Sequence, residues 1–171
     1  MFLKSAVPAL LAAVLLALPH AVSAQTTISR IPLPNNSTFP ISEGVWVGDT
    51  LYLSGTIDPA AMKGTPGDTQ TQTTNILLAI QKTLADQHLG LGDIVMMHAY
   101  LAGDPAKSGK MDFAGFMASY SQFFGTKDQP NKPARSAMQV AALAAPGALI
   151  EIEVIAARSP SATTMRAALG R

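Results

Sequence analysis

The sequence predicts an α/β (α+β) fold in which two helices pack on one face of a mixed β-sheet. The prediction depends on two observations: segments with the two-residue spacing of strands alternate with segments of helical spacing, and their order along the chain is β-β-α-β-α-β-β. A length of 171 residues fits a single domain of this kind, and the sequence contains no internal repeat.

The N-terminal end of the chain has the pattern of a secretory signal peptide. Lys4 is followed by an apolar run over residues 6–18 and by small residues at the −3 and −1 positions of a cleavage site after Ala24. The run is shorter than the roughly 20 residues of a membrane span, so we expect an exported protein, periplasmic or secreted, with no membrane segment. The expected segments are a signal peptide over 1–24, a folded domain over 25–158 and a polar tail over 159–171.

Composition restricts the chemistry and the partners of the mature chain. Cysteine is absent, which rules out disulfides, a thiolate nucleophile and cysteine metal ligands. Of the 12 Lys and Arg residues, only Lys4 falls in the signal peptide, so 11 remain against 11 Asp and Glu. No basic cluster could follow a phosphate backbone, and we expect no nucleic-acid partner. With 13% charged and 48% hydrophobic residues, part of the surface is expected to be covered by further copies of the chain.

The N-terminal part of the mature chain is expected to form an extended arm followed by a hairpin. Residues 26–40 contain three prolines and are expected to form an arm or loop. Two short strand-like runs between Gly44 and Gly55 flank a Gly-Asp-Thr turn at 48–50, a pattern typical of a β-hairpin. Gly55 is expected to end the second strand, where the chain turns or another group approaches the backbone closely.

Two helices and three strands are expected in the rest of the domain. Apolar spacing predicts helices over 68–88 and 111–124, and apolar runs predict strands over 94–101, 134–143 and 149–157. A stripe of aromatic residues and methionine lies on one side of the second helix, and we interpret it as core packing, not as a cofactor site. Its members are Phe113, Phe116, Met117, Tyr120 and Phe124.

The sequence contains no pattern for a metal or cofactor site. The three histidines are His20, which lies in the signal peptide, His88 and His98, and no two of them have the spacing of metal ligands. We therefore expect neither a metal nor a cofactor. His98, within the apolar run over 94–101, is expected to be a hydrogen-bonded core or interface residue.

The last two expected strands carry the charged residues that point to a function. Strand alternation places Arg135 and Ala137 on one face of the first strand, and Glu151 and Glu153 on one face of the second, which we expect to be its neighbour. Charges within apolar strands are costly unless they are paired or have a chemical role. The residues alone leave three interpretations open: a structural Arg–Glu bridge, solvent-facing glutamates, or a site.

These residues belong to a longer pattern that resembles the signature of the RidA/YjgF family. The pattern consists of LSG at 53–55, Asn75, GDIV at 92–95, Tyr120, Phe123-Phe124, PARS at 133–136, VA at 140–141, GA at 147–148 and IEIEVIA at 150–156. The resemblance implies a homotrimer with a barrel-like centre and a site in each cleft between subunits. It also implies cofactor-free hydrolysis of small imino or enamino acids, such as 2-aminoacrylate, to a 2-keto acid and ammonia.

By this resemblance, Arg135 and Glu151 are the catalytic residues. Arg135 would hold the substrate carboxylate through two parallel hydrogen bonds, and Glu151 would position the attacking water and transfer a proton. The backbone at Gly55 would contact the substrate, since no Cβ obstructs its approach. Glu153 is expected to be structural.

The chain departs from the family pattern at three positions of this site. Ile41 stands where many members have a tyrosine, Met117 where they have an asparagine on the second helix, and Ala137 where they have a cysteine. These differences predict a more apolar substrate pocket. We therefore expect a bulkier or more hydrophobic imino acid, supplied outside the cytoplasm, for instance by an exported oxidase.

Two other functions fit the same residues. A non-catalytic protein could use Arg135 to bind small carboxylates, which would stabilise the protein without turnover. A holdase-like protein could shield unfolded chains with exposed apolar surface, independently of Arg135. The presence of both Arg135 and Glu151 favours an enzyme of the 2-iminobutanoate/2-iminopropanoate deaminase type.

Overall fold

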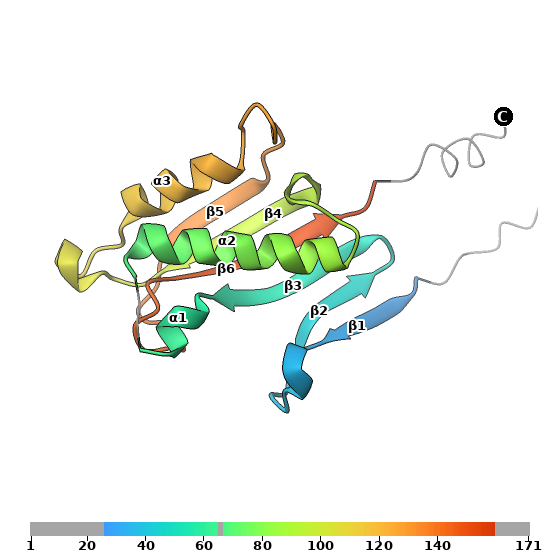
Figure 1. Ribbon diagram of the computed structural model, residues 1–171, viewed down its shortest axis with the longest axis horizontal. Coiled ribbons are helices and arrows are strands. Elements are labelled where there is room, and N and C mark those ends of the chain that lie inside the picture. The colour runs from blue at the N-terminus through green and yellow to red at the C-terminus, as the bar shows by residue number, and fades with distance from the viewer. Residues whose placement is uncertain (1–25, 65–66, 160–171) are drawn as a thin grey trace, which may run out of the picture.

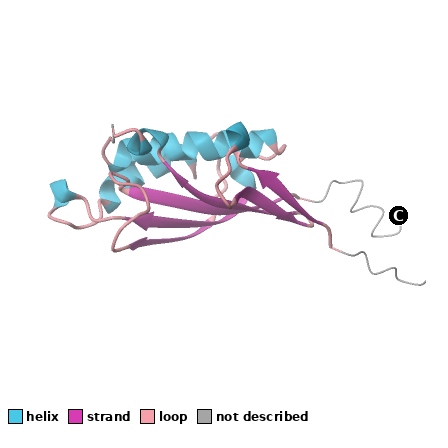
Figure 2. Ribbon diagram, turned by 90° about the horizontal axis from the view of Figure 1, so that it is seen from below, coloured by secondary structure: helices cyan, strands magenta, loops and turns pink. Residues whose placement is uncertain are grey.

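A computed structural model describes residues 26–64 and 67–159, so the expected signal peptide and all of the expected tail except Ser159 lie outside the described residues. The strands form one mixed sheet with the order β1-β2-β3-β6-β4-β5, and the long helices α2 and α3 pack on one of its faces (Figures 1 and 2). This arrangement confirms the predicted fold class. The elements are β1 (Ile28–Pro32), β2 (Ser42–Val47), β3 (Thr50–Ile57), α1 (Pro59–Met62), α2 (Thr69–Asp86), β4 (Ile94–Leu101), α3 (Phe113–Phe123), β5 (Ala134–Gln139) and β6 (Ile150–Ala157), with short 3-10 turns at Pro34–Asn36, Leu91–Asp93 and Pro105–Lys107.

Two strands differ from the sequence expectation. β1 lies within the segment expected to be an arm or loop and pairs antiparallel with β2. Pro32 is tolerated there because it ends an edge strand, where its missing N–H breaks no ladder. β5 stops at Gln139 and not at Leu143, because its partner β4 ends at Leu101, directly opposite Gln139, and offers no further backbone to pair with.

The expectation that the last two strands are neighbours is wrong. β4 lies between them, parallel to β5 and antiparallel to β6. The segment between β5 and β6 therefore does not close a hairpin but carries the chain past β4. As a result, the charged residues of β5 and β6 lie two strands apart.

Local side-chain chemistry sets the ends of the helices. Asp68 precedes α2 and its carboxylate accepts a hydrogen bond from the Thr71 backbone N–H at 2.8 Å, which lowers the pKa of Asp68. Asp112 caps α3 in the same way through the Gly115 N–H at 3.0 Å. After α2 the chain turns at His88, whose φ is 59°, and not at a glycine. Of the helices in the described ranges, none is long and apolar enough to cross a membrane.

The two faces of the sheet differ in what covers them. On the helix face, the side chains without exposed surface include Leu51, Ile76, Leu77, Leu84, Met97, Leu101, Phe116, Ile150 and Ile152. The other face, here called the open face, has no helix over it (Figure 2). By strand register it carries Tyr52, Met96, His98, Tyr100, Met138, Glu151, Glu153 and Ile155. Tyr52 is 46% exposed and Met138 42%, so apolar side chains on this face are available for contact with another copy of the chain.

Candidate functional site

Arg135 lies at the start of β5, at one edge of the sheet, with its side chain on the helix face. Its register partner is the fully buried Met97, which fixes this orientation. The guanidinium stacks on α3, with Cζ 4.3 Å from the ring centre of Tyr120 and 4.9 Å from that of Phe116. Its Nη1 lies 3.1 Å from the Met117 Sδ. The interpretation of the α3 stripe as core packing was therefore incomplete, because the stripe also forms a platform for Arg135.

Arg135 retains hydrogen-bonding capacity for an anionic ligand. A thioether is a weak acceptor, and among the ion pairs of the described residues none includes Arg135. Ala137, two residues further along the same face, is partly buried against the core and adds no polar group. The structure thus brings together Arg135, Met117 and Ala137, here called the arginine group.

Gly55 and Glu151 meet at a different place, on β3 and β6. The pairing of these strands is interrupted between Leu53 and Thr56, so Gly55 sits in a bulge inside β3, not at its end as the sequence suggested. A Cβ at position 55 would overlap the Glu151 carboxylate. The expectation of a close approach to this backbone is therefore confirmed, and the group that approaches is the carboxylate of Glu151.

The two glutamates of β6 have different surroundings. The Oε1 of Glu153 accepts a hydrogen bond from the Tyr100 hydroxyl at 3.0 Å and lies 2.8 Å from the His98 Nδ1, which confirms His98 as a hydrogen-bonded residue. Within the described residues, Glu151 makes no hydrogen bond and no ion pair. Burial, and then the charge of Glu153, raise the pKa of Glu151. Glu153 is thus held in a structural cluster, whereas the carboxylate of Glu151 is free to exchange a proton.

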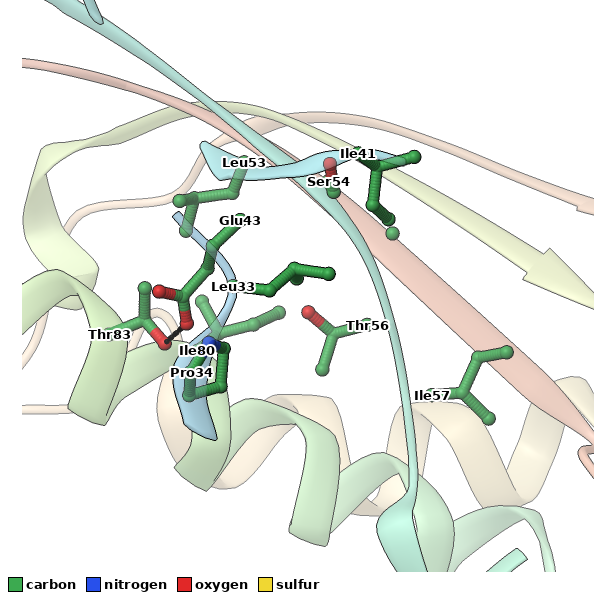
Figure 3. Close-up of a pocket in the computed structure, with 11 residues that line it drawn as sticks. Leu33, Pro34, Ile41, Glu43, Leu53, Ser54, Thr56, Ile57, Ile80 and Thr83 are labelled. Carbon is green, nitrogen blue, oxygen red and sulfur yellow. Dashed lines mark hydrogen bonds between the residues drawn. The ribbon is translucent and has the colours of Figure 1, made fainter. Parts of the chain in front are cut away.

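A cavity of about 250 Å³ opens beside Gly55, between β3, α2 and the segment that leads into β2 (Figure 3). Its walls are mainly apolar. Ile41, which the sequence placed in the site, lines this cavity and is 50% exposed. Glu43 is the only charged residue among the described lining residues, and its Oε1 accepts a hydrogen bond from the Thr83 hydroxyl at 3.2 Å. The sequence did not single out Glu43, because one glutamate near the start of a strand has no distinctive pattern.

The predicted site residues therefore fall into two groups that do not meet within one chain. Gly55 and Glu151, with Ile41 at the cavity that Gly55 lines, are here called the glutamate group. β4 separates this group from the arginine group, and the Glu151 side chain also lies on the opposite face of the sheet from Arg135. Glu151 pairs with Tyr100 and faces the open side, whereas Arg135 pairs with Met97 and faces the helices. Strand spacing puts the Cα atoms of Arg135 and Glu151 roughly 14 Å apart. This geometry excludes the structural Arg–Glu bridge that the sequence left open.

The two groups together offer a carboxylate receptor and an acid–base group. A guanidinium with unused donors is suited to a carboxylate, and a carboxylate with a raised pKa is suited to proton transfer. No cluster of three or more His, Asp or Glu side chains that could hold a metal ion occurs in residues 26–64 and 67–159.

Comparison with known proteins finds relatives along most of the chain. Residues 34–158 match the family described as Endoribonuclease L-PSP. A RutC family protein of Saccharolobus solfataricus is 38% identical over 122 residues, which cover 70% of this chain and 88% of the relative. A RutC family protein of Sulfurisphaera tokodaii is 36% identical over 121 residues, with 70% and 88% covered.

Solved structures share the fold. E. coli TdcF, crystallised with bound serine, is 32% identical to this chain and has a TM-score of 0.60. The match covers 72% of this chain and 91% of TdcF. A Pseudomonas aeruginosa protein of unknown function has a TM-score of 0.65 at 23% identity, with 78% of this chain and 94% of that chain covered. The second likeness concerns the fold alone.

Proposed function

Since the chain belongs to the RidA/YjgF family, the family described as Endoribonuclease L-PSP, we propose that it is a deaminase that hydrolyses imino acids without a cofactor. One observation carries the proposal beyond family membership. The chain combines an arginine with unused donors, held on an aromatic platform, with a glutamate that has no partner in the described residues and a raised pKa. These are the two groups that hydrolysis of an imino acid requires.

In the proposed reaction, Arg135 binds the substrate carboxylate through two hydrogen bonds. Ionised Glu151 accepts a proton from water while the water oxygen bonds to the imine carbon, and it passes this proton to the nitrogen, which gives a carbinolamine. Glu151 then transfers the hydroxyl proton of the carbinolamine to the nitrogen, the C–N bond breaks, ammonia leaves, and the carbonyl of the 2-keto acid forms. An enamine first takes a proton on carbon and loses one from nitrogen to give the imine. Because the imine carbon is already electrophilic, no covalent nucleophile of the protein is needed.

We further propose that the site forms between two copies of the chain in a homotrimer. The separation of the arginine group from the glutamate group supports this, since one chain cannot bring both to one substrate. The open face supplies apolar area for the contact. The arginine group of one subunit would then face the glutamate group of the next.

The substrate is proposed to be an imino acid with a side chain larger than that of 2-aminoacrylate. Serine bound to TdcF shows an amino acid in the structure of a relative, which supports a substrate of 2-amino-acid character. Ile41, Met117 and Ala137 contribute apolar surface where the family has polar groups, which favours a bulkier side chain. The pattern of residues 1–24 supports export, and an exported oxidase would supply the imine.

The test is ammonia release from imino acids that an amino-acid oxidase generates in situ, with the mature protein beside Arg135→Ala. We expect the wild type to accelerate ammonia release for several side chains and Arg135→Ala to lose the acceleration. If the protein binds 2-keto acids but does not accelerate ammonia release, it is a carboxylate-binding protein and not a deaminase. Suppression of aggregation that is equal in both proteins, again without acceleration, would favour a holdase.

A further inference from the structure

The thioether of Met117 lies against the guanidinium of Arg135, the group that holds the substrate carboxylate in the proposed reaction. We propose that Met117 is a modification site for peroxide: its oxidation to the sulfoxide gives Arg135 a strong hydrogen-bond acceptor within its own chain and thereby weakens substrate binding. This inference rests on the proposed function of Arg135 and adds to it a reversible regulation by a hydroperoxide.

The geometry places the sulfur where an oxygen bound to it would meet the guanidinium. Nη1 of Arg135 lies 3.1 Å from Sδ of Met117. Cζ lies 4.3 Å from the ring centre of Tyr120 and 4.9 Å from that of Phe116, and these contacts hold the guanidinium beside α3. A thioether is a weak acceptor, whereas a sulfoxide is polar and its oxygen can accept a charge-assisted hydrogen bond from Arg135. Oxidation would therefore turn a weak contact into a strong one.

A guanidinium that is bound to a sulfoxide has fewer donors for a substrate. The substrate carboxylate is proposed to accept two parallel hydrogen bonds from Arg135. After oxidation, the sulfoxide oxygen and the carboxylate would compete for the donors of Nη1, and the added oxygen would occupy space beside that nitrogen. The substrate would lose one of its two charge-assisted hydrogen bonds, while Glu151 would remain unchanged.

Met117 belongs to the side-chain type that peroxide attacks most readily in this chain. The sequence contains no cysteine, so no thiol competes for the oxidant. Met117 is partly exposed, whereas Met97 has no exposed surface. In the reaction, a sulfur lone pair bonds to one peroxide oxygen and the O–O bond breaks. The hydrogen of the bonded oxygen passes to the other oxygen, which leaves as water, so the sulfur is oxidised and the peroxide is reduced.

The proposed source of the substrate is also a source of the oxidant. An oxidase that converts an amino acid to its imine and passes the two electrons to molecular oxygen releases hydrogen peroxide. Met117 would therefore meet the oxidant wherever the protein meets its substrate. Methionine sulfoxide reductases restore the thioether, which makes the modification reversible.

The experiment treats the mature protein with hydrogen peroxide, removes the peroxide with catalase and maps the added oxygen by peptide mass spectrometry. We expect Met117 and the exposed Met138 to be oxidised and the buried Met97 to stay unmodified. The KM for an imino acid, measured with catalase present, and the dissociation constant of 2-ketobutyrate are both expected to rise about tenfold, because one charge-assisted hydrogen bond is lost. The change in kcat should be smaller. Methionine sulfoxide reductases A and B are expected to restore both constants.

Three variants assign the effect to residue 117. Met117→Leu keeps an apolar side chain that peroxide does not oxidise, and its KM should be the same before and after treatment. Met117→Gln places a carbonyl group at the position of Sδ and should have a raised KM without any peroxide. Met138→Leu is the matched control, because it removes an exposed methionine on the open face and should respond to peroxide as the wild type does.

The outcomes separate this inference from the proposed function. If Met117 stays reduced while Met138 is oxidised, or if oxidised Met117 leaves both constants unchanged, the inference fails and the deaminase stands. A rise in KM that also occurs in Met117→Leu would overturn it in the same way. If no imine is hydrolysed before or after treatment, the deaminase fails, and the affinities for 2-ketobutyrate decide about Met117. A protein that neither hydrolyses imines nor binds 2-ketobutyrate before treatment would overturn both.

Discussion

At the scale of single residues, the environment of Glu151 explains why one of two similar glutamates is suited to catalysis. The missing Cβ at Gly55 leaves space for the Glu151 carboxylate against the β3 bulge. Burial and the charge of Glu153 raise its pKa, whereas the carboxylate of Glu153 is occupied by Tyr100 and His98. A carboxylate that is easier to protonate is a stronger base when ionised, which is the property that water activation requires.

Glu151→Gln is predicted to reduce kcat/KM by about 10²–10⁴-fold, because the amide cannot accept the proton of water. The same variant is expected to melt at a higher temperature than the wild type at pH 7. The raised pKa means that ionised Glu151 opposes folding once the pH exceeds its unfolded value of about 4.3. Below that value the side chain is neutral in both states, so the difference should vanish at pH 3. Thermal scans at both pH values check this, and a variant that melts lower at pH 7 would contradict it.

Gly55→Ala is predicted to lose most of the activity, because the new methyl group displaces the Glu151 carboxylate. Gly90→Ala is a matched control, since its φ is −130° and a Cβ there would meet only the Asp93 carboxylate at 3.9 Å. The measurement is kcat/KM with one imine for both variants. Similar activity in the two would show that the position of Glu151 does not depend on Gly55.

Some of the site residues could be predicted from the sequence and others could not. Arg135, Glu151 and Gly55 could be singled out because strand alternation and a family pattern surround them. Glu43 could not, because its significance comes from the cavity and from Thr83, which is 40 residues away in the chain. The role of the α3 stripe was also hidden, since Phe116 and Tyr120 have the same helical spacing whether they pack in the core or beneath a guanidinium.

At the scale of elements, α3 and β5 together determine the orientation of Arg135. The helix is capped by Asp112 and presents Phe116 and Tyr120 to the guanidinium at 4.9 and 4.3 Å. Cation–π contacts restrict the rotamers of the arginine before any substrate arrives, which reduces the entropy that binding would cost. The sequence spacing of apolar residues could predict that these segments form a helix and a strand. Their order in the sheet could not, because the β5–β6 segment is compatible with both a hairpin and a crossover past β4.

Tyr120→Leu is predicted to raise KM several-fold, up to about tenfold, with a smaller effect on kcat, because the ring that orients Arg135 is lost. Tyr120→Phe keeps the ring and is expected to behave like the wild type, since the Tyr120 hydroxyl makes no hydrogen bond within the described residues. Steady-state kinetics with one imine distinguish the two. A KM for Tyr120→Leu equal to that of Tyr120→Phe would show that the Tyr120 ring does not orient Arg135 for substrate binding.

At the scale of the whole molecule, the open face is the largest feature that the single chain leaves unexplained. Helices bury one side of the sheet, while Tyr52 and Met138 remain about half exposed on the other (Figure 2). In the proposed trimer, contact through this face places the arginine group, at the β5 edge of one copy, beside the glutamate group of another. The low charge of the sequence pointed to such a contact, but the sequence could not show that the two halves of the site lie on opposite faces.

Tyr52→Asp is predicted to dissociate the oligomer and to abolish deaminase activity, because it places a charge within the apolar contact. Leu78→Asp is the control: Leu78 is 51% exposed on α2, on the helix side of the sheet, and should tolerate the charge. Mass determination in solution reports the outcome. A trimer of Tyr52→Asp with full activity would mean that the open face is not the contact surface.

The central claim is that Arg135 and Glu151 act on one substrate from two different subunits. The most direct test mixes Arg135→Ala and Glu151→Gln, each inactive alone, under conditions that exchange subunits. We predict that ammonia release returns to about a quarter of the wild-type rate, because that share of the contacts would combine an intact arginine group with an intact glutamate group. A mixture that forms hybrid oligomers and remains inactive would contradict the claim.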